Sequence, residues 1–315
     1  MPNIRANGIN LHYESFGDGE PLLLIMGIGG QMIQWDEDFC RALSTEGFRV
    51  IRFDNRDVGM SEILDHLGTP DINRLMLQRA LGGRIRAPYT LDDMADDTAG
   101  LLDALGLPSA HIVGMSLGGM VAQCLALRHP ARVRSLGIIM SAPGELLPGM
   151  PSPRALGALT YRSKQQGEQA AIDYQLNFFR VVSAAPHRTP EPRLRELAAL
   201  HYQRGAHPRG FARQFAAILA SPGRSRRLSD LRVPTLVLHG DKDPLITHWA
   251  GRLIAARIPG AKLSVIENMG HDLGPTLWPY VIDAIKSNTQ RTLPANAKPM
   301  GLVRALTQPA IEVET

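Results

Sequence analysis

The chain has 315 residues, of which 44% are hydrophobic, and this is enough for the core of one large α/β domain. The two cysteines, Cys40 and Cys124, lie far apart in stretches of helical periodicity, which excludes a disulfide framework and a cysteine metal site. The formal net charge is only +4, and the arginines lack the interleaved aromatic residues of single-strand binders, so we expect no nucleic-acid partner.

The first part of the chain alternates between strand and helix patterns. Residues 9–15 alternate in polarity as a strand does, and residues 21–26 (PLLLIM) form the continuous apolar run of a strand buried on both faces. The patterns that follow are helix 36–46, strand 49–53, helix 92–106, strand 111–113, helix 119–128 and strand 135–140. This order predicts an α/β fold with a mostly parallel sheet and helices on both faces.

The alternation stops between residues 142 and 229. No convincing strand pattern occurs there, and breaks rich in Pro and Gly separate helical runs such as 193–203 and 211–219. We therefore expect an inserted helical cap. Residues 145–230 also hold 13 Lys and Arg against 6 Asp and Glu. This excess is typical of a solvated helical surface, although it would also attract anionic substrates.

Strand and helix patterns return after the insertion. They are strand 234–239, helix 247–257, strand 262–267 and helix 277–288. The last residues hold several prolines and no strong periodicity. We expect a core domain of residues 1–141 and 230–291, a cap or lid of residues 142–229, and a C-terminal tail of residues 292–315 that is extended or packed along the surface.

The stretch AHIVGMSLGGMVAQ, residues 110–123, is the first candidate for chemistry. Ser116 lies between a buried strand and a helix, and Gly114 and Gly118 on either side leave space for a sharp backbone turn. Elsewhere in a globular chain a Gly-x-Ser-x-Gly motif is more often structural. At the end of a buried strand it is typical of a nucleophile, so we predict that Ser116 is catalytic.

A serine hydroxyl becomes a nucleophile at neutral pH only when a base accepts its proton. Among the ten histidines, His271 lies in ENMGHD (267–272), on a loop at the carboxyl end of a strand, where α/β sheets place their sites. We predict that His271 is the base. The other histidines, His239 among them, lie next to regular elements or in the insertion and have packing explanations.

The base needs a carboxylate that orients it and stabilises its charged form. The loop HGDKDPLI (239–246) offers Asp241 and Asp243. We choose Asp243 because Pro244 fixes the chain direction directly after it, whereas Asp241 beside a glycine is typical of a turn. Glu145, after the strand 135–140, is a weaker candidate.

Two backbone amides are candidates for binding the oxyanion of a tetrahedral intermediate. Leu117 begins a helix, where N–H groups are free and the helix dipole is positive. The loop MGIGG (26–30) follows a buried strand, and its glycines allow the backbone to approach a ligand, so we choose the amide of Ile28 as the second donor. We expect substrate contacts from Gly27, Gly29 and Met115.

These motifs resemble those of the α/β-hydrolase superfamily, over roughly residues 4–288. MGIGGQMIQW, RFDNRDVGMS, PYTLDDMADD and GMSLGGMVAQ are similar to segments of the bacterial carboxylesterases of the aclacinomycin methylesterase-like group. The resemblance implies an eight-stranded sheet with an inserted cap. It also puts Ser116, Asp243 and His271 at the triad positions and Ile28 and Leu117 at the oxyanion-hole positions.

The chain departs from this family's pattern at one position and matches it in a further segment. Most relatives have His before the first glycine of the oxyanion loop, whereas this chain has Met26. The departure affects side-chain hydrogen bonding within the loop and leaves its amide donors in place. DNRDVGMS (54–61) matches a segment that is mainly structural in the family.

We therefore expect a serine esterase that cleaves a carboxylic ester through an acyl-enzyme intermediate, without a metal or an organic cofactor. A serine nucleophile disfavours epoxide hydrolases and haloalkane dehalogenases, which use Asp in this fold. Lactonases, perhydrolases, amidases and carbon–carbon bond hydrolases share the triad and stay open, as does a non-catalytic ligand-binding protein. Leu176, Phe178 and Phe179 are candidates for pocket lining or cap core.

Neither a membrane nor a secretory pathway is indicated. No apolar run is long enough to cross a bilayer, and the N-terminal sequence lacks the charged-then-apolar pattern of a signal peptide. We expect a cytoplasmic monomer or homodimer that acts on a small-molecule ester.

Overall fold

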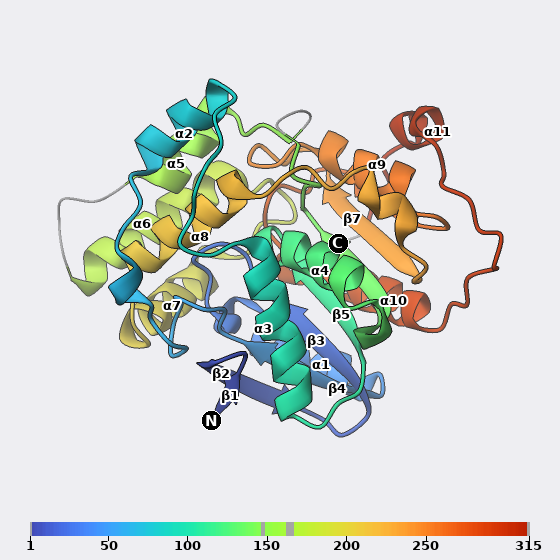
Figure 1. The fold of residues 1–315 in the computed structure, drawn as a ribbon, viewed down its shortest axis with the longest axis horizontal. Coiled ribbons are helices and arrows are strands. Elements are labelled where there is room, and N and C mark those ends of the chain that lie inside the picture. The colour runs from blue at the N-terminus through green and yellow to red at the C-terminus, as the bar shows by residue number, and fades with distance from the viewer. Residues whose placement is uncertain (1, 146–148, 162–166, 314–315) are drawn as a thin grey trace.

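An eight-stranded sheet runs through the centre of the molecule (Figure 1). The computed structural model describes residues 2–145, 149–161 and 167–313. The strands are β1 (Asn3–Ala6), β2 (Ile9–Phe16), β3 (Glu20–Ile25), β4 (Phe48–Phe53), β5 (Ala110–Met115), β6 (Val133–Ile139), β7 (Thr235–Gly240) and β8 (Lys262–Ile266). Their order in the sheet is β1-β2-β4-β3-β5-β6-β7-β8, which confirms the predicted eight-stranded sheet.

The sheet is parallel from β4 to β8 and antiparallel at one edge. Strand β2 pairs antiparallel with both β1 and β4, whereas each neighbouring pair from β4 through β3 to β8 is parallel. The parallel strands therefore end at one edge of the sheet, and the loops that follow β3, β5, β7 and β8 meet there.

Helices cover both faces of the sheet. Helices α3 (Leu91–Ala104), α4 (Leu117–Arg128) and α9 (His248–Arg257) pack on one face, and α1 (Glu37–Thr45) and α10 (Trp278–Thr289) pack on the other. Alternate side chains of β3 point to the two cores, because Leu23 and Ile25 join the first and Leu22 and Leu24 the second. All four are fully buried, as the continuous apolar run predicts.

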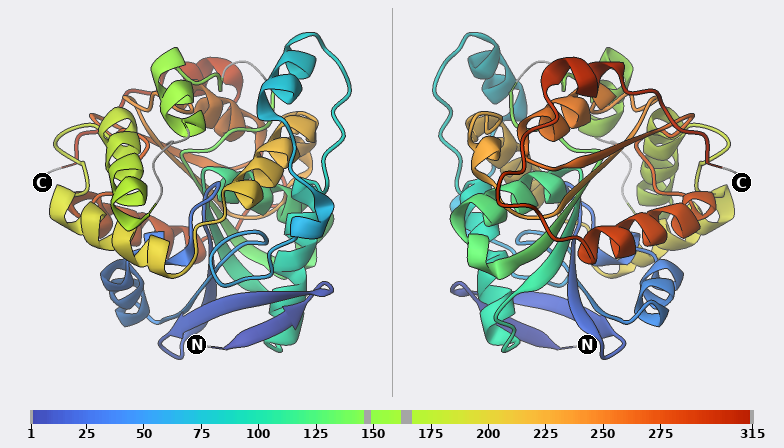
Figure 2. Two further views of the ribbon diagram at one scale, coloured as in Figure 1. Left: turned by 90° about the vertical axis from the view of Figure 1, so that its left-hand side faces the viewer. Right: turned by 90° about the vertical axis from the view of Figure 1, so that its right-hand side faces the viewer.

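A further group of helices, which we call the helical layer, lies over the carboxyl ends of the strands (Figure 2). It consists of α2 (Ile72–Ala80), α5 (Pro153–Thr160), α6 (Glu168–Val182), α7 (Glu191–Gln203) and α8 (Pro208–Ala220). The expected cap, residues 142–229, includes residues 146–148 and 162–166, which lie outside the described residues. Helix α2 belongs to the expected core segment but packs its Ile72 and Met76 against Phe215 of α8.

The C-terminal segment packs along the β8 side of the sheet (Figure 2). A short helix, α11 (Leu302–Thr307), lies against α9, and Arg252 of α9 donates hydrogen bonds to the carbonyls of Ala305 and Gln308 at 2.6 and 2.7 Å. The amide of Ile311 then donates to the carbonyl of Val265 in β8 at 2.7 Å. These contacts cover part of the edge strand, which would otherwise expose unpaired backbone groups. The last two residues of the expected tail lie outside the described part.

The loop after β4, residues 54–61, is held by buried ion pairs, which agrees with a structural segment. Each of three charged side chains in the loop contacts an opposite charge on a helix, in the pairs Asp54–Arg204 (2.7 Å), Arg56–Asp97 (2.5 Å) and Asp57–Arg213 (2.7 Å). The side chains of Asp57 and Arg213 are fully buried. Burial would raise the pKa of the Asp57 carboxyl, but the Arg213 guanidinium and the Leu64 amide hold it below its usual value.

We expect Asp57→Asn to lower the free energy of unfolding by about 3 kcal/mol, because the Arg213 guanidinium loses its buried charge partner. Urea denaturation of both proteins measures this difference. The pKa of Asp57 is lower in the folded state than the value of 3.8 expected in the unfolded chain, so its ionisation stabilises the folded state fully above pH 3.8. This stabilisation is lost as the pH falls through the pKa of the folded state. The difference in the free energy of unfolding between the wild type and Asp57→Asn should therefore become smaller as the pH falls below 3.8.

Glu37→Gln is the matched control, because Glu37 forms an exposed ion pair with Arg41 on helix α1. Exposed pairs contribute roughly 0–1 kcal/mol, so this variant should unfold close to the wild-type midpoint. If both variants lost the same small amount of unfolding free energy, the Asp57–Arg213 pair would not be what holds the loop against α8.

Candidate active site

Ser116 forms the turn between β5 and α4. Its backbone has φ 56° and ψ −121°, a combination that costs energy for a residue with a side chain. The turn is fixed on both sides, because the Ser116 amide donates to the Ile139 carbonyl at 2.9 Å and the Ser141 hydroxyl donates to the Ser116 carbonyl at 2.7 Å. The strand-to-helix turn predicted around Ser116 is thus present, and its side chain lines a cavity.

The two glycines of the motif make this turn possible. A Cβ on Gly114 would lie 2.2 Å from the Gly118 carbonyl oxygen, and a Cβ on Gly118 would lie 2.0 Å from the Ile25 carbonyl oxygen. Neither distance is compatible with a side chain, and both obstacles are backbone atoms that cannot move aside. The glycines therefore allow α4 to begin directly against the end of β3.

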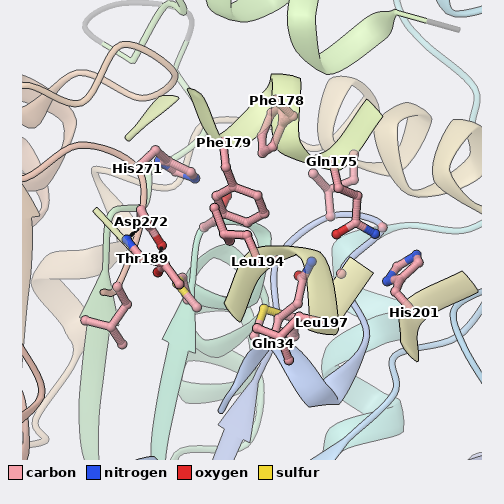
Figure 3. A pocket seen from close by; sticks show the side chains of 18 of the residues that line it. Gln34, Gln175, Phe178, Phe179, Thr189, Leu194, Leu197, His201, His271 and Asp272 are labelled. Atoms are coloured by element: carbon pink, nitrogen blue, oxygen red, sulfur yellow. Dashed lines mark hydrogen bonds between the residues drawn. The ribbon is translucent and has the colours of Figure 1, made fainter. Parts of the chain in front are cut away.

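His271 and Asp243 are brought into contact by the loops after β8 and β7. The His271 Nδ1 lies 2.7 Å from Asp243 Oδ2, and the other oxygen, Oδ1, accepts hydrogen bonds from the amides of Leu245 and Ile246, both at 2.9 Å. Because Nδ1 donates to the carboxylate, Nε2 of a neutral His271 is free to accept a proton. His271 and Ser116 line the same cavity, which is also lined by Phe178 and Phe179 of the helical layer. Figure 3 shows His271 and these two phenylalanines.

A second histidine contacts the same carboxylate, and the sequence analysis assigned it only a packing role. The fully buried His239, at the end of β7, directs Nε2 to the Ile246 carbonyl at 2.7 Å and to Asp243 Oδ2 at 3.3 Å. Both neighbours are acceptors, so Nε2 carries the proton. Its spacing of four residues from Asp243, across a turn, is the only signal for this contact in the sequence.

The environment of Asp243 favours its ionised form. Burial alone would raise the pKa of this carboxyl, but the His271 and His239 imidazoles and their hydrogen bonds hold it well below its usual range. The carboxylate therefore remains charged at any pH at which the protein would work. Such a group can keep one imidazole tautomer in place and stabilise the protonated ring.

The two other candidate carboxylates point elsewhere. Asp241 accepts a hydrogen bond from the Asn268 amide at 2.7 Å and pairs with Lys242 at 3.1 Å. Glu145 accepts from the Ser225 amide at 3.0 Å. Both carboxylates stabilise loops, as the turn interpretation of Asp241 predicts.

Asp272, directly after His271, was not singled out from the sequence. Its buried carboxylate accepts hydrogen bonds from the Ser183 hydroxyl at 3.0 Å and from the amide and hydroxyl of Thr189 at 2.8 and 2.9 Å. Burial raises the pKa of this carboxyl, while these hydrogen bonds act in the opposite direction. The contacts join the loop of His271 to the segment between α6 and α7, so His271 and the helical layer are positioned together.

The glycine-rich loop after β3 lies beside Ser116. A Cβ on Gly27 would lie 3.2 Å from the Ser116 Cβ, so the loop backbone borders the hydroxyl. Within the described part of the chain, the amides of Ile28 and Leu117 donate no hydrogen bond. Two free N–H groups next to a serine hydroxyl are what an oxyanion requires. Gly27, Ile28, Gly29 and Met115 line the cavity with Ser116.

Two side chains from other parts of the fold form hydrogen bonds with the backbone of this loop, and the side chain of residue 26 forms none with any described residue. Met26 is buried in the core, and the Asn55 side chain donates to its carbonyl at 3.0 Å. Gln214 of α8 accepts from the Gly29 amide at 2.8 Å and donates to the Arg56 carbonyl at 2.8 Å. The side-chain hydrogen bonding that Met26 cannot provide therefore comes from Asn55 and Gln214.

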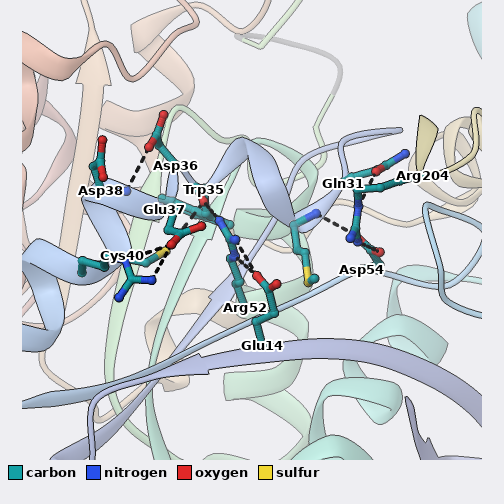
Figure 4. A network of polar contacts seen from close by, with 12 residues as sticks. Glu14, Gln31, Trp35, Asp36, Glu37, Asp38, Cys40, Arg52, Asp54 and Arg204 are labelled. Atoms are coloured by element: carbon teal, nitrogen blue, oxygen red, sulfur yellow. Dashed lines mark hydrogen bonds and ion pairs between the residues drawn. The ribbon is translucent and has the colours of Figure 1, made fainter. Parts of the chain in front are cut away.

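A polar network continues beneath the loop (Figure 4). Arg204 donates to the Gln31 side chain at 2.9 Å and to Asp54 at 2.7 Å, and Asp54 also accepts from the Met32 amide at 2.7 Å. Arg52 pairs with Glu14 at 2.5 Å and donates to the Trp35 carbonyl. The loop is thus supported by charged groups that are themselves satisfied.

In residues 2–145, 149–161 and 167–313, no three His, Cys, Asp or Glu side chains are grouped so that they could hold a metal ion. None of the helices in these ranges combines the length and the apolar character needed to cross a membrane.

Comparison with known proteins gives matches along most of the chain. A family model described as alpha/beta hydrolase fold matches residues 20–275. Rhodomycin D methylesterase DauP from Streptomyces sp. (strain C5) is 29% identical over 312 residues, covering 91% of this chain and 97% of the relative. The 2-hydroxymuconate semialdehyde hydrolase of Pseudomonas putida is 30% identical over 280 residues, covering 85% and 86%.

A solved structure also matches this chain over most of its length. The enol-lactonase from Burkholderia xenovorans LB400 superimposes with a TM-score of 0.69 at 25% sequence identity, covering 92% of this chain and 100% of that protein. The sheet and the helical layer therefore have counterparts over nearly the whole length of both chains.

We expect the His271 Nδ1 proton to give a proton NMR signal far downfield of the amides, because it is hydrogen-bonded to a buried carboxylate. Asp243→Asn should abolish this signal or shift it strongly upfield. Asp241→Asn should leave it unchanged, since Asp241 accepts from the Asn268 amide instead. The reverse pattern would mean that Asp241 is the partner of His271.

Proposed function

The chain belongs to the alpha/beta hydrolase fold family, as its motifs predict, and on this premise we propose that it cleaves a carboxylic ester through an acyl-enzyme intermediate. It is a hydrolase whose relatives include methylesterases. The observation that carries the proposal is the arrangement around the cavity: Ser116 on a strained turn, and His271 held at Nδ1 by the buried Asp243.

In the first half of the reaction, Ser116 Oγ attacks the ester carbonyl carbon while His271 Nε2 takes the hydroxyl proton. The carbonyl oxygen becomes an oxyanion and accepts hydrogen bonds from the amides of Ile28 and Leu117. When the tetrahedral intermediate collapses, the bond to the alcohol oxygen breaks and His271 gives its proton to that oxygen. The alcohol leaves and the acyl group stays on Ser116.

In the second half, water takes the place of the alcohol. His271 Nε2 removes a proton from the water, whose oxygen attacks the acyl carbon, and the same two amides hold the second oxyanion. Collapse of this intermediate returns the proton to Ser116 Oγ and releases the carboxylic acid. Asp243 stays ionised throughout and stabilises the imidazolium in both halves.

We also propose that residues 142–229 act as a cap that forms the roof of this site. The lining residues Phe178 and Phe179 of α6, Leu194 of α7 and Phe211 of α8 support this division. They enclose the cavity with apolar side chains, which would exclude water from the reacting ester and strengthen the electrostatic effect of the two amides.

We expect Ser116 to be labelled covalently by a fluorophosphonate, because the reagent needs an activated serine and a site for its oxyanion. Ser116→Ala should be neither labelled nor able to hydrolyse short p-nitrophenyl esters above a small residual rate. Intact-mass spectrometry and release of p-nitrophenol measure the two effects. Normal labelling of the alanine variant, or an unlabelled wild type, would exclude Ser116 as the nucleophile.

The role of the Asp243 carboxylate is tested by measuring ester hydrolysis by two isosteric variants. Asp243→Asn should lower kcat/KM roughly a thousandfold or more, since the amide cannot stabilise the imidazolium and favours the wrong tautomer. Asp241→Asn is the matched control from the same loop and should retain most of the activity. A large loss in both would indicate that the loop, rather than the Asp243 charge, is what activity requires.

A further inference from the structure

The cavity has a second polar end, away from Ser116. Three hydrogen-bonding side chains line it from separate elements: Gln34 from the 3-10 helix Met32–Gln34, Gln175 from α6 and His201 from α7. In Figure 3 Gln175 and His201 lie on the side of the cavity away from His271, and Gln34 lies below them beside Leu197.

Apolar side chains separate the two polar ends. Phe178 and Phe179 of α6 lie on one wall, and Leu194 and Leu197 of α7 lie on the opposite wall (Figure 3). The cavity therefore presents a reactive end, an apolar middle and a polar far end. A ligand that fills it needs the same sequence of chemical groups.

The polar groups at the far end lack partners within the protein. The Nδ1 of His201 is buried without a hydrogen bond, and the half-buried side-chain amides of Gln34 and Gln175 form none with any other described residue. Polar side chains that line a cavity without partners of their own are suited to a ligand that supplies donors and acceptors.

The charges around the cavity disfavour an anionic ligand. Of the described residues that line it, none is Lys or Arg, whereas Asp36 and Asp272 are present. The nearby Arg193 binds Asp36 through two hydrogen bonds of 2.8 and 2.9 Å, so this cation is already neutralised. His201 adds no positive charge, because burial, and then the neighbouring Arg204 and His207, lower its pKa to about 4.

We propose that Gln34, Gln175 and His201 form a distal subsite that binds an uncharged hydroxyl or carbonyl group of the substrate. The proposal rests on the ester hydrolysis proposed above and narrows its substrate class. The preferred substrates are neutral esters in which an apolar segment separates the ester from a hydroxyl or keto group. Carboxylate-bearing esters are rejected, because no Lys or Arg among the described lining residues offsets their desolvation.

The test uses sets of esters that differ only in the far-end group, which is methyl, hydroxyl or carboxylate. The group is placed on the acyl chain in one series and on the alcohol chain in another, over a range of chain lengths. At the best length and placement we expect hydroxyl esters to exceed methyl esters by on the order of tenfold in kcat/KM. Carboxylate esters should fall below the methyl esters.

Variants connect this preference to two of the three side chains. Gln175→Leu and His201→Leu should each reduce the ratio of hydroxyl to methyl rates toward one, because leucine keeps the volume and removes the hydrogen bond. Gln169→Leu is the matched control, since Gln169 lies exposed on the same helix α6 and bonds only to Asp173. This control should keep the wild-type ratio. Circular dichroism checks that each variant is folded.

Binding to Ser116→Ala separates this inference from the proposed function. Calorimetry with the same ester sets should give a lower Kd for the hydroxyl ester than for the methyl ester, whether or not the wild type turns either over. Equal Kd values at every length and placement, or tighter binding of the carboxylate ester, would overturn the subsite. A wild type that binds hydroxyl esters preferentially but hydrolyses none would instead contradict the proposed function.

Discussion

The close approach of two backbone segments is the constraint on which the site depends. Helix α4 begins so near the end of β3 that the Ile25 carbonyl oxygen would lie 2.0 Å from any Cβ at position 118. This contact puts the free amides at the start of α4 beside the glycine loop that follows β3. It also forces Ser116 to positive φ, which lifts its side chain toward the cavity. The proposed nucleophile and the proposed oxyanion donors therefore depend on one packing contact.

Positioning the remaining groups requires the helical layer as well as the sheet. The His271 amide donates to the Val182 carbonyl at the end of α6 at 2.7 Å, and Asp272 binds the segment between α6 and α7. Gln214 of α8 holds the Gly29 amide. The loop of His271 and the glycine loop after β3 are thus both hydrogen-bonded to the layer. A change in the layer would therefore move the residues around the cavity as well as alter access to it. This explains how the glycine loop is held although the Met26 side chain contributes no hydrogen bond.

The sequence predicts the features that have local causes and misses those that depend on distant contacts. Seven strands and the Ser116 turn follow from apolar runs and glycine spacing. Strand β1 is four residues long and only partly buried, α2 has no fully buried residue, and α11 is held by Arg252 from another helix. The same distinction applies to the site. The choice of Asp243 over Asp241 rests on local turn chemistry, whereas its contact with His239 and the grouping of Gln34, Gln175 and His201 arise only on folding.

The uneven charge of the chain also has a structural cause. Residues 145–230 carry most of the positive excess, and three of their arginines reach out of the layer: Arg193 to Asp36, Arg204 to Asp54 and Arg213 to Asp57. All three carboxylates belong to loops at the carboxyl edge of the sheet. Charge complementarity therefore joins the layer to the sheet around the cavity. The two buried pairs, Arg204–Asp54 and Arg213–Asp57, are screened little by salt. Because these three arginines are paired with aspartates, part of the positive charge of the segment stabilises the contact between the layer and the sheet.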